Sequence, residues 1–422
     1  MAATLTGLRY RLLPHPGQER ILGRSVGACR WLWNWALDYR ENIWLAVRGS
    51  GAKGVMGSVG YVHLSSLLPG LKQEYPWLAE APHHALQATL RDFDRAFAAF
   101  FAGRAGFPQF HHKGDRDSMR FPDPKQVKVV EDWVKLPKLG WVHFRRSRPL
   151  GGEVRNVTVS REGDAWYISF CVRGEFVLPN AGRAPIGIDL GISQSVTTSL
   201  GEVISFPVPA EKEERRLRLL QRRASRRQKG SRGRRLACRA VAKVRRHWAR
   251  RRRDAAHKAS TRFATTHVLV ALEDLPIQRM TASARGSKEN PGRNVEAKAK
   301  VNRGMLANAH ADFRRMLAYK CARSGARLVI VDPAYTSQTC QACRHVSPEN
   351  RKSQAVFLCT ACGFATNADW NAAVNVLAAG QAVTAQGGLG VTPAFELRTH
   401  PRDRKPSRSG STGIPAKAAP AA

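Results

Sequence analysis

Hydrophobic and polar positions along the first hundred residues predict one strand followed by helices. Residues Leu5 to Leu13 alternate loosely between apolar and polar and end at Pro14 and Pro16, which indicates a strand and a turn. Beyond the turn, apolar residues recur every three or four positions, as expected for amphipathic helices. They are Ile21, Leu22, Val26, Cys29, Leu32 and Trp33 in one stretch and Leu86, Leu90, Phe93, Phe97, Phe100 and Phe101 in another. We therefore expect a helical block over residues 15–104.

The pattern changes to that of short strands between residues 105 and 182. The segments Val154 to Val159 and Ala165 to Val172 are strand-like and are separated by glycine turns, which predicts a small β-barrel or sheet. Aromatic side chains stand among histidines and basic residues at the start of this region, at Phe107, Phe110 and Phe121. They fit either a structural core or a surface that faces nucleic acid, and the pattern leaves both open.

A strongly basic segment follows the apolar strands that begin near residue 184. Between Glu211 and Lys258 there are 21 Lys or Arg residues against 4 acidic ones, with Leu217, Leu220, Val241 and Val244 spaced for a helical face. The whole chain has 69 Lys and Arg against 32 Asp and Glu, a formal charge of +37. Coding bias or an ordinary solvated face are the plain alternatives. The depletion of acidic residues favours a helical segment, 211–265, that binds the phosphate backbone of a nucleic acid.

The ends of the chain and its hydropathy bear on where the protein works. No run of about eighteen apolar residues occurs, and the N-terminal sequence MAATLTGLRYRLLPHPG has no apolar signal core. We expect a soluble, intracellular protein. Residues 381–422 are rich in Gly, Pro, Ser and Ala, which predicts a disordered tail.

Four of the eight cysteines form two C-x2-C pairs separated by fifteen residues. They are Cys340, Cys343, Cys359 and Cys362. This spacing is typical of a zinc ribbon in which four thiolates hold one tetrahedral Zn²⁺. Because all four coordination positions are filled by protein, we expect one structural zinc ion, and a reducing compartment without a disulfide framework.

Three carboxylates are candidates for a second metal site, although each alone is weak evidence. Asp189 lies in an apolar strand, where a carboxylate is costly unless it is paired or binds a cation. Glu273 ends a four-residue apolar run, a place where acids often only cap a turn. Asp369 shares a helical face with Ala373 and Val376, but it also fits an N-terminal helix cap.

The order of the three acids is more informative than any one of them. An acid in a first strand, one at a later strand end and one on a closing helix is the arrangement of an RNase H-like fold. In such folds two Mg²⁺ ions about 4 Å apart are held between carboxylates and act on a phosphodiester. The sequence therefore predicts an α/β nuclease that uses magnesium through Asp189, Glu273 and Asp369.

Several motifs, taken in their order and spacing, resemble the TnpB family of transposon-encoded RNA-guided nucleases, relatives of the compact type V CRISPR effectors. They are RLLPHPGQERIL, GACRWLWNWAL, YPWLAEAP, FFAGRAGFPQFHHKG, GIDLGIS, ALEDL, YTSQTC and ADWNAAVNVL. The resemblance runs over nearly the whole chain and implies a multidomain α/β protein. The implied parts are a wedge β-barrel (1–14 and 105–182), a helical recognition domain (15–104), a RuvC-like nuclease domain (183–336 and 364–380) and the zinc ribbon (337–363).

The resemblance also implies an activity, partners and a location. A TnpB protein would bind a guide RNA of the omega type and cleave matching double-stranded DNA next to a short motif. The implied location is the prokaryotic cytoplasm, in association with the nucleoid. The alternatives are a regulator that occupies DNA without cutting it, a transposase or resolvase that joins strands, and a type V CRISPR effector. The guide, the motif and the choice between monomer and homodimer stay open.

Two positions depart from the family pattern. Arg344 stands where relatives usually have Gly, and Ala368 where Arg usually precedes the last Asp. We expect the first to alter only the knuckle turn, and the second to bear on cleavage rate and not on metal binding.

Overall fold

The computed structural model describes residues 4–50, 59–115, 117–182, 184–192, 194–287 and 289–385. The chain divides into two compact units, and the boundary along the sequence lies between Gly174 and Glu175. The predicted tail falls largely outside the described residues. Its first five residues belong instead to the last helix, α11 (Ala368–Ala385), which therefore runs past the expected end at residue 380.

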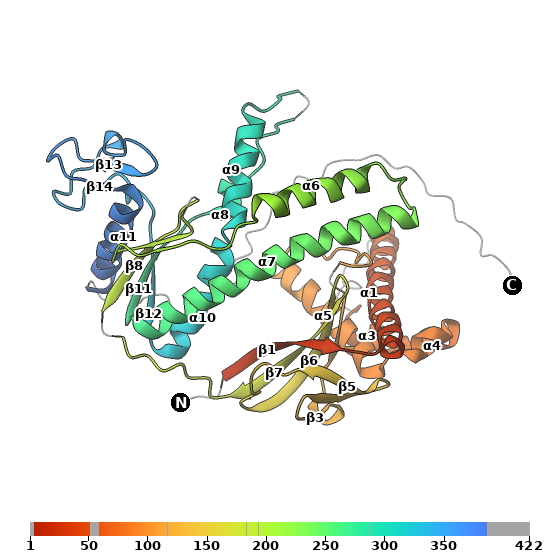
Figure 1. Cartoon of the computed structure of the whole chain (residues 1–422). Helices are drawn as coiled ribbons and strands as arrows, with labels where there is room; N and C mark the ends of the chain where they lie inside the picture. The colour runs from red at the N-terminus through yellow and green to blue at the C-terminus, as the bar shows by residue number, and fades with distance from the viewer. Residues whose placement is uncertain are drawn as a thin grey trace. The chain divides into compact units, whose positions relative to one another are not determined.

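The N-terminal unit, residues 4–174, contains a seven-stranded antiparallel sheet (Figure 1). Its strands are β1 (Thr4–Leu13), β2 (Ser118–Phe121), β3 (Lys128–Val130), β4 (Trp133–Leu136), β5 (Gly140–Arg145), β6 (Glu153–Glu162) and β7 (Ala165–Gly174). The order across the sheet is β2-β6-β7-β1-β5-β4-β3, so the first strand lies near the centre. Within the described residues no recorded pairing joins β2 to β3, and closure into a barrel stays a prediction.

Helices fill the long connection between β1 and β2. They are α1 (Pro16–Ser50), α3 (Tyr61–Ser66), α4 (Leu68–Glu74), the 3-10 turn η1 (Pro76–Glu80) and α5 (His83–Phe101). The predicted apolar face of α5 is confirmed at Leu86, Leu90, Phe93 and Phe97, which are buried. Phe101 is an exception, since it is 61% exposed at the end of the helix.

The C-terminal unit is built on a five-stranded mixed sheet of order β10-β9-β8-β11-β12. These strands are β8 (Pro185–Asp189), β9 (Val196–Thr198), β10 (Val203–Ile204), β11 (Leu269–Glu273) and β12 (Arg327–Val331). The three strands β8, β11 and β12 run parallel, and β11 is buried along its whole length. Such continuous burial explains why these strands appear in the sequence as apolar runs, since both faces of the sheet are covered.

Helices cover both faces of this sheet (Figure 1). The side chains of Ile188 and Leu272 pack with Phe263 of α7 (Arg232–Thr266) and Phe313 of α10 (His310–Ser324). The alternate residues of β11 and β12 pack against α11 instead. Because neighbouring residues of a strand point to opposite faces, each position in β8 and β11 is assigned to one of the two layers.

Two further features fix the layers. A Cβ atom at Gly187 would lie 2.2 Å from the backbone oxygen of Ala373, and one at Gly380 would lie 2.5 Å from the Cβ of Ala271. Glycine at both positions therefore lets α11 approach the sheet closely. On the other face, the buried Lys320 of α10 donates to the backbone oxygen of His257 and the hydroxyl of Ser260 in α7, at 2.6 and 2.8 Å.

The basic segment forms two helices, α6 (Glu211–Ser225) and α7, as predicted. The remaining elements are η2 (Pro124–Gln126), α8 (Ile277–Met280), α9 (Val295–Ala307), η3 (Pro348–Asn350), β13 (Val356–Leu358) and β14 (Ala365–Asn367). Across the residues that the structure describes, no helix has the length and apolar character needed to cross a membrane.

Candidate active site

Strand parity brings Asp189 and Glu273 to the same face of the sheet. Ile188 and Leu272 are register partners, so the acid that follows each of them lies at the neighbouring step of the two parallel strands. Ile188 and Leu272 face α7 and α10, and the two acids therefore face α11. Both carboxylates are buried, with 9% and 6% of their surface exposed.

Asp369 reaches the same face from the first turn of α11. It is 8% exposed, and its Oδ2 would lie 3.7 Å from a Cβ atom placed on Gly191, two residues beyond Asp189. The helix cap is provided by Asn367, whose side-chain oxygen accepts hydrogen bonds from the amides of Asp369 and Trp370, both at 3.0 Å. Asp369 is thus not needed as a cap, and its carboxylate is left for other contacts.

The three acids create an excess of negative charge. Burial, followed by the charges of Glu273 and Asp369, raises the pKa of Asp189 to about 8. Burial also raises the pKa of Glu273 and of Asp369, while Arg351 lowers the pKa of all three acids. A cluster whose members resist ionisation in this way is stabilised by a bound cation, because the cation offsets both desolvation and mutual repulsion.

Arg351 was not singled out by sequence reasoning. Its Nη2 lies 3.5 Å from Oδ1 of Asp369, so a guanidinium does stand beside the last acid. The position thought to have lost a basic residue, Ala368, is instead fully buried with Cys340 and Phe357. No signal in the sequence marks Arg351, because it lies eighteen positions before its partner in a separate turn.

The three acids offer carboxylate oxygens, which are the ligands that Mg²⁺ prefers in proteins. Among the described residues, the three acids do not form a group whose ligand atoms all lie within 4.8 Å of one another. A single small ion with metal–oxygen bonds of about 2.1 Å therefore would not contact all three acids in this geometry.

The four predicted zinc ligands come together as one cluster. The sulfurs of Cys340 and Cys362 are 3.7 Å apart, and those of Cys343 and Cys359 are 3.5 Å apart. A tetrahedron with Zn–S bonds of about 2.3 Å has edges of about 3.8 Å. All four ligand atoms lie within 4.8 Å of one another, so the cluster has the size of a tetrathiolate metal site.

The departure at Arg344 has a structural consequence in this cluster. Its φ is +64°, the left-handed region in which glycine is favoured and other residues are strained. Its Nη1 lies 3.4 Å from Oδ1 of Asn375 in α11. Arg344 therefore has a strained backbone conformation, and its side chain contacts the last helix.

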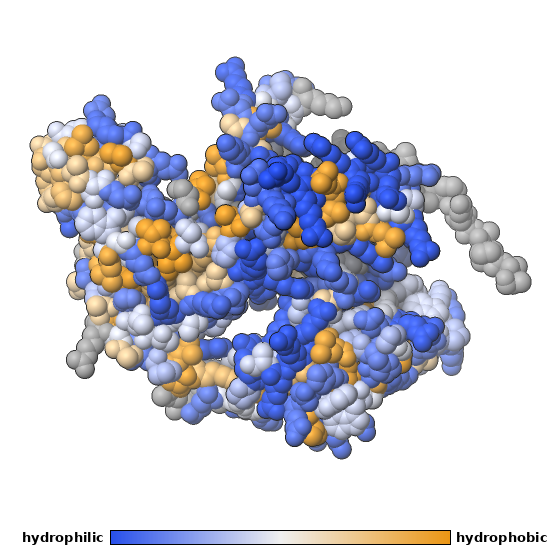
Figure 2. Space-filling model, in the orientation of Figure 1, coloured by the Kyte–Doolittle hydropathy of each residue, from blue (hydrophilic) through white to orange (hydrophobic). Residues whose placement is uncertain are grey.

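The basic helices present a charged surface, which is mostly blue over α6 and α7 in Figure 2. Four acidic residues in this segment each form an ion pair: Glu211 with Arg215, Glu214 with Arg218, Glu213 with Arg251 and Asp254 with Lys258. Most of the 21 basic residues thus remain in excess. The predicted apolar face is confirmed, since Leu217, Leu220, Val241 and Val244 are half-buried.

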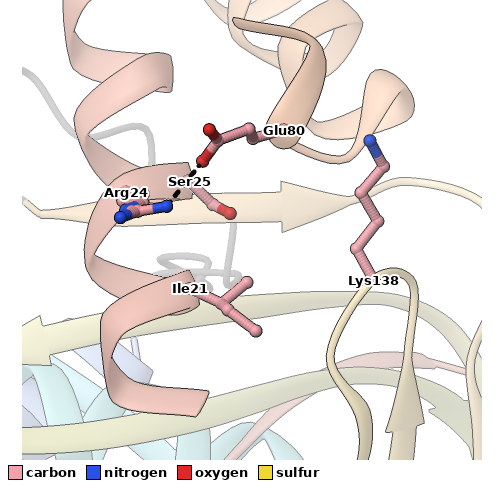
Figure 3. A pocket seen from close by; sticks show the side chains of 5 residues that line it. All are labelled: Ile21, Arg24, Ser25, Glu80 and Lys138. Carbon is pink, nitrogen blue, oxygen red and sulfur yellow. Dashed lines mark hydrogen bonds and ion pairs between the residues drawn. The ribbon is translucent and has the colours of Figure 1, made fainter. Parts of the chain in front are cut away.

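The N-terminal unit has a small pocket of about 230 Å³ lined by Ile21, Arg24, Ser25, Glu80 and Lys138 (Figure 3). Arg24 and Glu80 form an ion pair across it at 3.0 Å, and Lys138 donates to the backbone oxygen of Ala79. The single acid that lines this pocket is therefore already paired with a guanidinium.

Comparisons with known proteins support the family resemblance. Residues 1–48 match a family described as a helix-turn-helix domain, residues 171–284 one described as a probable transposase, and residues 310–376 a Cas12f1-like TNB domain. The first of these ranges contains strand β1 and most of the long helix α1, which continues to Ser50.

Full-length relatives are also similar. The chain is 37% identical over 388 residues to the "Putative RNA-guided DNA endonuclease InsQ" of Escherichia coli (strain K12), covering 91% of this chain and 94% of that protein. It is 33% identical over 422 residues to a Streptomyces pristinaespiralis protein with the same description, covering 96% and 97%. A solved Cas12f1-sgRNA-target DNA complex aligns with a TM-score of 0.41 and 13% identity, over 89% of this chain and 98% of that chain. The identity and coverage of the full-length relatives show that this chain is a member of the transposon-encoded TnpB family.

Proposed function

We propose that the protein is an RNA-guided DNA endonuclease that hydrolyses phosphodiester bonds with two magnesium ions. The observation that carries the proposal is the convergence of Asp189, Glu273 and Asp369 on one face of the sheet, buried and short of positive charge. The names of the full-length relatives support the guided activity. The C-terminal sheet and its helices would then be a RuvC-like nuclease domain, and the N-terminal unit would hold the wedge and recognition parts.

The three carboxylates would hold the magnesium ions, which supply Lewis-acid stabilisation of the phosphodiester and activation of water. The chain's own residues prepare the site. Asn367 caps α11 and leaves the carboxylate of Asp369 available, while Arg351 holds that carboxylate from the ribbon side. The guanidinium of Arg351 is also suited to bind a phosphate oxygen, because its fork matches that geometry.

The basic surface of α6 and α7 is the proposed contact for the guide RNA or its duplex with DNA. A duplex held by backbone and shape needs basic residues in large excess over acidic ones and no sequence-reading geometry. The four-cysteine cluster would hold one structural zinc ion, since all its ligand positions are occupied by thiolates.

A cleavage assay tests the proposal. With the copurified RNA, a matching DNA duplex and Mg²⁺, wild type should cut, and Asp189→Ala should be slower by about 10³-fold or more, since it removes a metal ligand. Asp274→Ala is the matched control, because Asp274 is exposed and pairs with Arg314 on the surface. Equal cleavage by wild type and Asp189→Ala would defeat the nuclease proposal, and bound but uncut DNA in wild type would favour a regulator.

A CRISPR effector is the nearest alternative. A Cas12f1 from Sulfoacidibacillus thermotolerans is 43% identical over 65 residues, but this covers only 15% of the chain. The transposon-encoded assignment is favoured by the coverage of the full-length relatives, 91% and 96% of this chain.

A further inference from the structure

We propose that Thr336, Asn375 and Asn371 form a hydrogen-bonded chain through which the folded four-cysteine cluster sets the divalent-cation affinity of the acidic site. They are positioning residues, because none of them is a proposed metal ligand. The inference rests on the proposed function, since it takes Glu273 as a ligand of magnesium.

The hydrogen-bonded series of side chains begins beside Glu273. The hydroxyl of Thr336 lies 2.5 Å from Oε1 of Glu273 and 3.0 Å from the backbone oxygen of Pro333. Both Thr336 and Glu273 are buried, at 8% and 6% exposure, so water does not readily replace this contact. The hydroxyl therefore fixes which way the carboxylate of Glu273 points.

Asn375 holds the backbone of Thr336 in turn. Its Nδ2 donates to the backbone oxygen of Thr336 at 2.9 Å and to that of Thr339 at 2.7 Å. One turn earlier in α11, Nδ2 of Asn371 donates to the same Thr339 oxygen at 2.8 Å. Two buried asparagines of one helix thus hold the segment that leads from Thr336 to the first cysteine.

The chain ends in the first cysteine knuckle. The amide of Gln341 donates to Oδ1 of Asn371 at 3.1 Å, so Thr339 and Gln341 are both anchored on either side of Cys340. The sulfur of Cys340 faces that of Cys362 at 3.7 Å within the cluster. A metal-filled cluster would hold this knuckle, and with it the backbone that presents Thr336, in one conformation.

A second route leads from the ribbon to another acid. Arg351 lies between the two cysteine pairs and contacts Asp369 at 3.5 Å. The ribbon therefore contacts Asp369 directly through Arg351, and it is linked to Glu273 through Thr336, which lies just before the ribbon. Partners of ligands commonly change metal affinity by about 10- to 100-fold when they are removed.

The test measures Mn²⁺ binding, and not cleavage, by calorimetry on the full chain with its copurified RNA. Thr336→Val keeps the shape of the side chain but loses the hydroxyl, and we expect it to weaken Mn²⁺ binding by about 10-fold or more. Thr336→Ser restores the hydroxyl and should bind Mn²⁺ much as wild type does. Zinc content should stay at one ion per chain in both variants, which shows that the ribbon is intact.

A substitution in the cysteine cluster, at the other end of the hydrogen-bonded series, completes the test. Cys343→Ser alters no residue that contacts Glu273, and it should lose zinc and weaken Mn²⁺ binding together. Wild-type Mn²⁺ affinity in Thr336→Val would overturn the inference, whether or not Cys343→Ser folds. Asp189→Asn separates the two proposals. If it binds Mn²⁺ as tightly as wild type, the proposed metal site is wrong. If Asp189→Asn loses Mn²⁺ affinity and Thr336→Val does not, only the proposed coupling is wrong.

Discussion

The four-cysteine cluster and the acidic site are both suited to metal, but they are assembled differently. The cysteine sulfurs already stand at distances of 3.5 and 3.7 Å, close to the edges of a zinc tetrahedron, and they come from 23 consecutive residues. The acids come from positions 189, 273 and 369, and burial together with mutual repulsion raises the pKa of Asp189 to about 8. A local site is thus defined by its spacing, whereas a site made by tertiary packing depends on how closely a helix approaches a sheet.

The largest expected effect follows from that approach. Gly187→Ala would place a Cβ atom 2.2 Å from the backbone oxygen of Ala373, so α11 must shift and move Asp369 away from Asp189. We expect a loss of about 2 kcal/mol in the free energy of unfolding. Cleavage should need a higher Mg²⁺ concentration, and zinc content should be unchanged. Chemical denaturation, cleavage against Mg²⁺ concentration and metal analysis measure the three effects.

A matched substitution gives the control. Gly23→Ala lies in the helix α1, where a Cβ atom has no neighbour within 4 Å, and it should leave zinc content and the Mg²⁺ requirement of cleavage unchanged. Its free energy of unfolding should rise by about 0.5–1 kcal/mol, since alanine is favoured over glycine inside a helix. Loss of zinc in Gly187→Ala would mean that the packing of α11 on the sheet also holds the cysteine cluster together.

The second effect is a dependence of stability on pH. The folded-state pKa of Asp189, about 8, lies above its ordinary value of 3.8, so the folded state binds this proton more tightly than the unfolded state. The resulting stabilisation is complete below pH 4 and is lost as the pH rises towards 8. Relative to Asp189→Asn, wild type without added Mg²⁺ should therefore lose thermal stability over this range.

Added Mg²⁺ should restore part of the thermal stability that wild type loses relative to Asp189→Asn, because it favours the ionised carboxylates. The measurement is the melting temperature of both proteins at a series of pH values, without chelator so that the cysteine cluster keeps its ion. Parallel melting curves for wild type and Asp189→Asn would contradict the raised pKa.

The smallest effect concerns the cysteine cluster. Arg344→Gly relieves a left-handed residue at φ +64° but gives up the 3.4 Å contact to Asn375. Since left-handed strain costs about 1 kcal/mol or more and a long contact contributes less, the variant should be more stable by up to about 1 kcal/mol. Equilibrium unfolding checks this, and a destabilised Arg344→Gly would show that the contact outweighs the strain.

Sequence patterns predicted what depends on local spacing. The apolar face of α5, the basic helices and the closeness of the four cysteines are confirmed, and the burial of Asp189, Glu273 and Asp369 agrees with the expectation for cation-binding acids. Their roles as magnesium ligands stay a prediction. The domain boundaries expected from the resemblance also stay predictions.

Contacts between distant residues could not be predicted. Thr336 and Arg351 reach their acids across 63 and 18 positions, and neither residue type is unusual in its sequence context. The burial of Ala368 beside Cys340 could not be predicted for the same reason, because it depends on the packed ribbon. The expected effect of this position on cleavage rate stays a prediction. Phe101 fits the helical spacing but lies exposed where α5 ends, which spacing alone does not reveal.

The alternation of side chains between the two faces of β8 and β11 limits where insertions and deletions can be tolerated. Deleting one residue within β11 would turn Glu273 towards Phe263 and Phe313, since a shift of one position exchanges the faces of a strand. The connection between β10 and β11 contains α6 and α7, and the buried residues of α7, from Ala256 to Ala264, pack on the sheet. An insertion at the turn between α6 and α7 lies before these residues and would leave both acids on their face of the sheet. Insertions there would change the basic surface without changing the acidic site.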